Sequence, residues 1–222
     1  KMGGLELTLS LPAEGAGGGG EEKGWKGGLG ALQAVERNVL TALVNWHVEE
    51  GAHSTAASLL RRLIALPPPD PALRWTLLRL HLMFGCVEAA EECVPDCQAN
   101  DPAGAQGLQA HMHRGFIALA KGQYTAAASH LEAALVADPS SVTAATNLAV
   151  ACLYSKQLNK ATSALETLIR GAPIESMTYA VVFNLCTLYD LQGPDGNAKK
   201  RMMQALARKY APEDFDMAAC KL

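Results

Sequence analysis

The hydrophobic pattern of the chain is helical over most of its length. Apolar residues recur every three or four positions, first along residues 32–50 and again along 55–66, which is the spacing of one face of a helix. The first of these segments carries Leu32, Val35, Val39, Leu43 and Trp46 on its apolar face. Asp70-Pro71 offers an N-cap and a proline at the first helical position, so a third helix is predicted to start there and to turn at Gly85.

The stretch 108–141 gives the clearest repeat unit. Its landmark residues are Gly115, Gly122, Tyr124, Ala127, Leu131, Ala134 and Pro139. A shift of 34 residues brings four of them onto residues of similar size, namely Leu158, Ala161, Leu165 and Pro173, and it brings Gly115 onto the equally small Ala149. Agreement in one register over this many positions indicates an internal repeat.

Small residues at these positions have a steric purpose. Where two helices of a hairpin cross, glycine or alanine lets the backbones approach, and the bulky residues one turn away fill the flanks. The spacing G-x6-G-x-Y-x2-A-x3-L-x2-A-x4-P resembles the tetratricopeptide repeat (TPR). The resemblance implies an all-α, right-handed solenoid of about five helical hairpins. The alternative is a helical bundle whose alanines coincide by chance.

The repeats are expected at about 37–70, 71–104, 108–141, 142–175 and 176–212, followed by a C-terminal cap, so the solenoid covers 31–222. In the second repeat, the helix predicted over 87–98 contains Pro95, which should end or kink it. The fifth hairpin is predicted over 178–191 and 198–209. Residues 1–30 read as a flexible glycine-rich segment, in which the alternating run 5–11 is either disordered or a strand that adds to a partner.

The composition supports the all-α class and limits the classes of partner that are expected. Alanine and leucine dominate the apolar residues and β-branched residues are few. The net charge of −3 over 222 residues shows no basic excess, so a nucleic-acid partner is not expected. Because the chain has neither a run of 18 apolar residues nor a signal-peptide pattern, we expect a soluble intracellular protein without an integral membrane segment. A chain that opens on Lys1 is compatible with a fragment of a longer protein.

No constellation in the sequence points to catalysis, a cofactor or a metal. His111 and His113 lie two apart, so they would not chelate one ion from a helix. Cys93 and Cys97 share a face but lack two further ligands, and the six cysteines are expected to be small apolar residues without disulfides. Nucleophile elbows and phosphate loops are absent, so an enzyme is not predicted. The cationic pairs 61–62 and 199–201 read as solvated helix ends.

The TPR resemblance places the binding surface on the first helix of each repeat, which lines the inner, concave side. The candidate contact residues are Met112, Phe116, Val150, Leu153, Tyr154 and Phe183. Aromatic residues at desolvated interfaces are the usual binding hot spots. Two alternatives stay open: these side chains pack against neighbouring helices, or the contact surface lies on the convex face.

Near the C-terminus the sequence is more specific. The runs VVFNLCTLYDL at 181–191 and ACKL at 219–222, with Lys199 and Lys200, resemble the C-terminal TPR region of the subunit-12 family of the transport protein particle (TRAPP) complex, a vesicle-tethering assembly. The resemblance covers about residues 108–222. It implies a cytoplasmic, non-catalytic adaptor in transport between endoplasmic reticulum and Golgi, which meets those membranes through other subunits of the complex.

Two classes of function therefore remain. One is a scaffold subunit of a large tethering complex, and the other is a free TPR adaptor that captures a peptide, as a co-chaperone or a ciliary transport module does. A tether subunit migrates in a large complex in native extract, whereas a free adaptor migrates near its own mass.

Overall fold

The computed structural model describes residues 24–100 and 107–221, with side chains from Gly30 onward, and this part of the chain is all-α. It divides into two compact units that are described separately. The first contains α1 (Gly24–Glu49), α2 (His53–Ala65), α3 (Pro71–Met83) and α4 (Val87–Ala99). The second contains α5 (Leu108–Ala120), α6 (Tyr124–Ala137), α7 (Val142–Tyr154), α8 (Leu158–Gly171), α9 (Tyr179–Gln192), α10 (Gly196–Tyr210) and the 3-10 helix η2 (Met217–Cys220).

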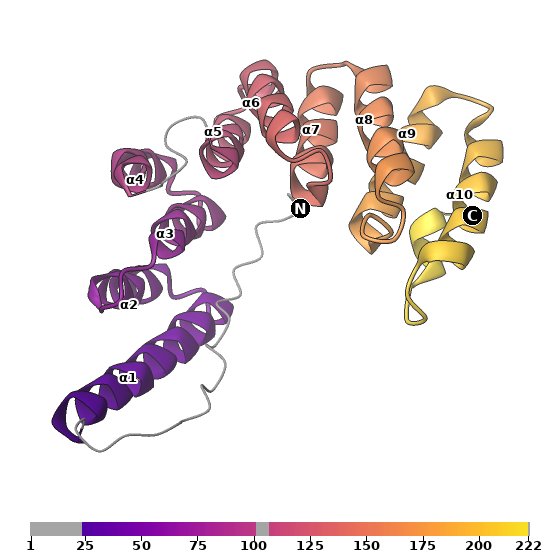
Figure 1. Cartoon of the computed structure of the whole chain (residues 1–222). Helices are drawn as coiled ribbons and strands as arrows, with labels where there is room; N and C mark the ends of the chain where they lie inside the picture. The colour runs from indigo at the N-terminus through magenta and orange to yellow at the C-terminus, as the bar shows by residue number, and fades with distance from the viewer. Residues whose placement is uncertain (1–23, 101–106, 222) are drawn as a thin grey trace. The chain divides into compact units, whose positions relative to one another are not determined.

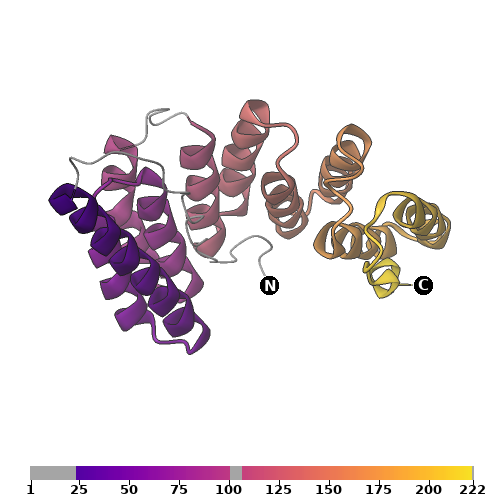
Figure 2. The same ribbon diagram turned by 60° about the horizontal axis from the view of Figure 1, so that its bottom comes forward.

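Within each unit the helices pack in the order of the chain. The pairs α1/α2 and α3/α4 form hairpins, and α2 also packs on α3 (Figure 1). In the second unit, α5/α6, α7/α8 and α9/α10 form hairpins, with α6 on α7 and α8 on α9 (Figure 2). Each helix thus packs against its neighbours along the chain, as the helices of repeat proteins do. The predicted all-α fold of helical hairpins is confirmed.

Small residues lie where the helices of a hairpin cross. Gly115 of α5 faces Leu131 of α6 so closely that a Cβ atom built on the glycine would lie 2.8 Å from Leu131 Cγ. Ala127, Ala149 and Ala161 are buried at the corresponding repeat positions. The steric interpretation of the repeat signature therefore agrees with the packing.

The hairpin turns repeat one backbone conformation. Gly51, Gly85 and Gly122 each adopt a positive φ of 72° to 75°, two residues after the end of the first helix of a hairpin. In the α7/α8 hairpin the equivalent residue is Lys156, with φ 63°. Its turn has the same hydrogen bonds as the Gly122 turn, because Gln157 N donates to Cys152 O just as Gln123 N donates to Ala118 O. Lys156 therefore adopts a left-handed conformation that an L-residue reaches only at a cost.

Lys156→Gly should raise the free energy of unfolding by about 0.5–1 kcal/mol, because it removes a left-handed strain of roughly 1–2 kcal/mol and adds a smaller loss of chain entropy. Urea unfolding measures the change. Lys121→Gly is the control, since Lys121 is right-handed at the end of α5 and should lose stability instead. A destabilised Lys156→Gly variant would contradict the assigned turn.

The helix ends follow the predicted signals. The Asp70 carboxylate accepts a hydrogen bond from Ala72 N at 2.9 Å, and Pro71 is the first residue of α3. Ser141 caps α7 through Ala144 N, and Asp138 binds Ser140 in the preceding turn. Pro139 and Pro173 each follow within two residues of the last helical residue of α6 and α8, so the predicted helix stops are confirmed.

Two helices differ from the expectation. Helix α1 begins at Gly24 rather than near Leu32, while the flexible segment and the run 5–11 otherwise lie outside the described residues. Helix α4 continues through Pro95 to Ala99, so of the two predicted effects, an end or a kink, the end is wrong. One proline removes one backbone hydrogen bond, whereas the bonds on either side of it remain.

Lys200 is also different, because it is buried rather than solvated. Its Nζ donates to the carbonyl of Lys221 at 3.0 Å and pairs with Asp190 Oδ1 at 2.6 Å. These contacts tie α9 and α10 to the C-terminal residues, where η2 packs on both helices. The predicted cap is present, but its helix starts at Met217 rather than at Pro212.

Candidate functional site

The predicted contact residues separate by exposure. Met112 and Phe116 are buried in the second unit, at 8% and 2% exposure, so they are core residues and offer almost no surface to a partner. Val150, Leu153 and Phe183 are half-buried. Tyr154 is 62% exposed. The structure therefore leaves Tyr154 as the freely accessible member of the predicted set.

Two aromatic pairs include these residues. The ring of Tyr154 stacks on that of Tyr124 with centroids 4.9 Å apart, which joins the end of α7 to the start of α6. Phe183 stacks on Tyr179 within α9 at 5.7 Å. The Lys221 ammonium lies 4.2 Å from the Phe183 centroid, a cation–π contact that covers this ring from the C-terminal cap.

A feature that the sequence did not predict lies on the second helices of the repeats. A cavity of about 330 Å³ opens between α6 and α8, with α7 at its base. Leu135 of α6, Leu148 of α7 and Leu168 of α8 are among its lining residues. At the rim the Lys160 ammonium pairs with the Glu132 carboxylate and links α8 to α6. The cavity is therefore an apolar depression with a charged edge.

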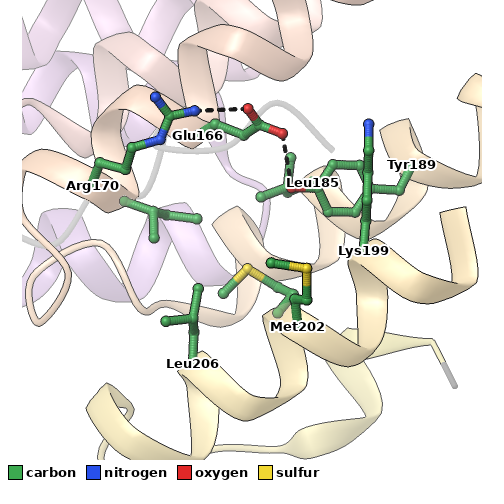
Figure 3. Close-up of a pocket in the computed structure, with 9 residues that line it drawn as sticks. Glu166, Arg170, Leu185, Tyr189, Lys199, Met202 and Leu206 are labelled. Carbon is green, nitrogen blue, oxygen red and sulfur yellow. Dashed lines mark hydrogen bonds and ion pairs between the residues drawn. The ribbon is translucent and has the colours of Figure 1, made fainter. Parts of the chain in front are cut away.

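A second cavity, of about 220 Å³, lies between α8 and α10 with α9 at its base (Figure 3). Ile169, Leu185 and Met203 provide apolar walls, and Met202 and Leu206 lie at the exposed side of α10. Its residues come from three successive helices, so the repeat stacking itself creates the depression.

Charged groups border this second cavity. Glu166 accepts hydrogen bonds from the Tyr189 hydroxyl at 3.1 Å and from Arg170 at 3.0 Å (Figure 3). Burial, followed by the charge of Glu166, raises the pKa of Tyr189 above its ordinary value, so the phenol stays protonated and donates to the carboxylate. Lys199 Nζ lies 5.2 Å from the Tyr189 ring centroid.

The two cavities are related by the repeat. Glu132 and Leu135 of α6 lie 34 residues before Glu166 and Ile169 of α8. Leu135 and Ile169 thus line the two cavities at equivalent repeat positions, and Glu166 lines the second cavity directly, whereas Glu132 is connected to the first through its ion pair with the lining residue Lys160. Their volumes lie at or below the lower end of the range for drug-sized ligands, about 300–1,000 Å³. They suit single apolar side chains presented by a protein partner.

The sequence placed contacts on the first helices and missed these cavities. The recurring Glu-x2-Leu and Glu-x2-Ile spacing of α6 and α8 was the available signal. It is also the pattern of an ordinary amphipathic helix, so the cavities become visible only when three helices are stacked.

The arrangement of the histidines gives little support to metal binding. In the described residues, histidines, cysteines and carboxylates nowhere gather in a group of three that could hold a metal ion. His113 Nδ1 lies 2.6 Å from the Gln109 carbonyl, while His111 lies beside His130. His53 Nε2 lies 2.9 Å from His81 Nδ1, a pair that the sequence did not suggest.

The six cysteines carry free thiols, and four of them are buried. Burial raises the pKa of both Cys97 and Cys186 to about 12, so these thiols stay protonated at neutral pH. They pack as small apolar residues. Among the described helices, none combines the length and the apolar character that crossing a bilayer requires.

Comparison with known proteins agrees with the repeat geometry. A sequence-family model described as tetratricopeptide repeat matches residues 118–173. Trafficking protein particle complex subunit 12 of Mus musculus is 26% identical over 202 residues, which cover 89% of this chain and 24% of the relative. The Homo sapiens protein of the same name is 25% identical over 202 residues. These residues cover 89% of this chain and 26% of the human protein. The chain thus spans about a quarter of the length of these relatives.

Solved structures share the fold. A thermophilic TPR protein of Thermus thermophilus superposes with a TM-score of 0.59 at 21% identity, over 84% of this chain and 100% of that one. The PilF protein of Pseudomonas aeruginosa gives a TM-score of 0.57 at 16% identity, over 82% and 79% of the two chains. The described helices therefore have the TPR fold, residues 118–173 match the tetratricopeptide-repeat model, and the chain is distantly similar to trafficking protein particle complex subunit 12.

Proposed function

We propose that this chain is a non-catalytic scaffold in a trafficking protein particle complex of the vesicle-tethering type, and that it contributes to transport between endoplasmic reticulum and Golgi. The observation that carries the proposal is the pair of repeat-related cavities on a TPR fold. Similarity to subunit 12 over 89% of the chain supports the choice of complex.

The cavities suggest how a partner subunit would bind. Each offers apolar walls for one or two side chains and has a glutamate already paired with a cation nearby, Glu132 with Lys160 and Glu166 with Arg170. A partner segment with apolar side chains spaced to reach both cavities would therefore match them. Burial of an aliphatic or aromatic side chain contributes about 1.5–3 kcal/mol. Two filled cavities would therefore supply a substantial part of a specific binding free energy.

This scaffold would work without a cofactor and in the cytoplasm. Its contact with membranes would be peripheral and would pass through the other subunits. Tyr154 and its stacked neighbour Tyr124 are a further exposed aromatic surface for such subunits.

Met202→Glu should release the partner subunits while the chain stays folded. Met202 is 69% exposed and lines the second cavity, so a carboxylate there would have to be desolvated beside Glu166 when a partner side chain enters. We expect at least a tenfold loss of co-purifying trafficking-particle subunits, measured by quantitative mass spectrometry from cells that express the tagged protein.

Ile174→Glu is the matched control, since Ile174 is 68% exposed and lines neither cavity. It should leave the co-purification unchanged, and circular dichroism should show equal helicity for both variants. Full recovery of the subunits with Met202→Glu would place the contact surface outside the second cavity.

A further inference from the structure

Helix α1 exposes an apolar surface. Its outer face carries a stripe, here called the α1 stripe, made of Leu32, Val35, Val39, Leu43 and Trp46, which are 38% to 68% exposed. Every exposed residue from Ala31 to Trp46 is apolar. A surface helix of a soluble protein normally turns polar and charged residues outward. A contiguous apolar face of this kind marks an interaction site.

The repeat shows what kind of partner this face accepts. A shift of 34 residues moves Val39, Leu43 and Trp46 onto three leucines of α3, namely Leu73, Leu77 and Leu80. Those leucines are buried in one cluster with Ala56, Leu60 and Leu63 of α2. The face that on α3 packs against a helix is thus present on α1, where the described residues leave it uncovered. The α1 stripe is built to receive a helix.

The spacing of the stripe identifies the second helix. Its residues are separated by three, four, four and three positions, a sequence of intervals that reads the same in both directions about Val39. Two copies of α1 that pair antiparallel would place Leu32 opposite Trp46 and Val35 opposite Leu43, with the two Val39 residues on the axis. An interface in which one patch meets itself is the hallmark of a two-fold dimer. We propose that the α1 stripe is a homodimerisation surface.

The charges near the stripe are compatible with this arrangement. Arg37 donates to the carbonyls of Leu66 and Pro68, and Glu36 pairs with Arg62, so these two charges are directed toward the α2 side of α1. Among the described residues of α1, like charges therefore do not meet at the axis.

The expected strength follows from the size of the contact. The stripe extends over about four turns, and the 3.5-residue average spacing fits the shallow crossing of paired helices. One helix from each copy lies at the low end of interface sizes, about 1,200 Å² or less in total. We therefore expect a dimer that forms in the micromolar range, and it needs none of the trafficking-particle subunits.

Sedimentation velocity of the purified chain tests the proposal. At about 100 μM the mass should approach twice the 23.4 kDa of one chain, and dilution to about 1 μM should dissociate it. Val39→Glu should weaken association at least tenfold, because two carboxylates would meet on the axis. Val39→Lys should do the same, and an equal mixture of the two variants should recover the dimer, because opposite charges would then face each other.

Val136→Glu is the control, since Val136 is 84% exposed on α6 and lies outside the stripe. It should dimerise like the parent chain. Leu32→Glu, at 68% exposure, provides a second stripe variant whose helicity can be checked independently. A parent chain that stays at 23.4 kDa at the higher concentration, or Val39→Glu that associates as strongly as the parent, would overturn the proposal.

Discussion

Gly115→Leu is expected to lower the free energy of unfolding by about 3 kcal/mol, at the upper end of the usual cost of overpacking. A Cβ atom alone would lie 2.8 Å from Leu131 Cγ and 3.0 Å from its Cδ2. Leu131 is fully buried, and the contact involves the branch point of its side chain, so it cannot move away easily. The hairpin α5/α6 would have to separate. Thermal and urea unfolding measure the loss.

Alanine at the same position sets two effects against each other. Glycine to alanine in a helix gains about 0.8–1 kcal/mol of propensity, whereas the clash with Leu131 costs about 1–3 kcal/mol. We expect the clash to outweigh the gain in helix propensity, so the free energy of unfolding of Gly115→Ala should be lower than that of the parent chain. Gly171→Ala is the matched control, because a Cβ at this last residue of α8 meets nothing within 4 Å. Equal stability changes at the two sites would mean that the α5/α6 crossing is wrongly placed.

Lys200→Ala is expected to cost about 2 kcal/mol. Removing one partner of a buried ion pair typically costs about 3–5 kcal/mol, and this value is reduced here because Asp190 is 44% exposed and can be hydrated after the loss. The Lys221 carbonyl would also lose its donor. The cap should then loosen, which is visible as faster amide exchange at the backbone amides of 218–221.

Arg201→Ala is the control for this experiment, because the neighbouring Arg201 is exposed. It should change stability by less than about 0.5 kcal/mol and leave exchange in the cap unaltered. If Lys200→Ala kept both the parent stability and the parent exchange rates, the ammonium would contribute nothing to holding η2 against α9 and α10.

The parts of the fold that were predicted correctly depend on local chemistry. The Asp70 cap, the helix stops before Pro139 and Pro173, and the close crossing at Gly115 each follow from a residue whose effect acts over one turn or one hairpin. The 34-residue repeat added the information that neighbouring hairpins share one geometry. Local signals repeated in register are sufficient for a fold in which each hairpin contacts only its neighbours.

The predictions that were wrong concern the exposure of side chains, which depends on residues that are distant in the sequence. The lysine run 199–200 looks solvated, yet Lys200 occupies a buried position because Asp190 and the C-terminal cap come to it from elsewhere in the chain. Phe116 looks like a groove residue, but it is covered by its neighbours in the stacked unit. The apolar face that forms the α1 stripe was predicted from its spacing, but only the structure shows that nothing among the described residues covers it.

The cavities and the α1 stripe would bind different partners in an assembly. The cavities between α6, α8 and α10 would be filled by other subunits, whereas the α1 stripe would join two copies of this chain. A complex built through both would contain an even number of copies. The sites lie in different units, so variants at one should leave the other intact.

The most direct test of the scaffold function is the native mass of the endogenous protein in gently lysed cells, measured by size fractionation and detection with an antibody. A scaffold subunit should migrate far above the mass of a dimer, together with other trafficking-particle subunits, and Met202→Glu should shift it downward. Migration of the parent protein at the mass of its own monomer or dimer, with no co-migrating subunits, would contradict the account and favour a free TPR adaptor.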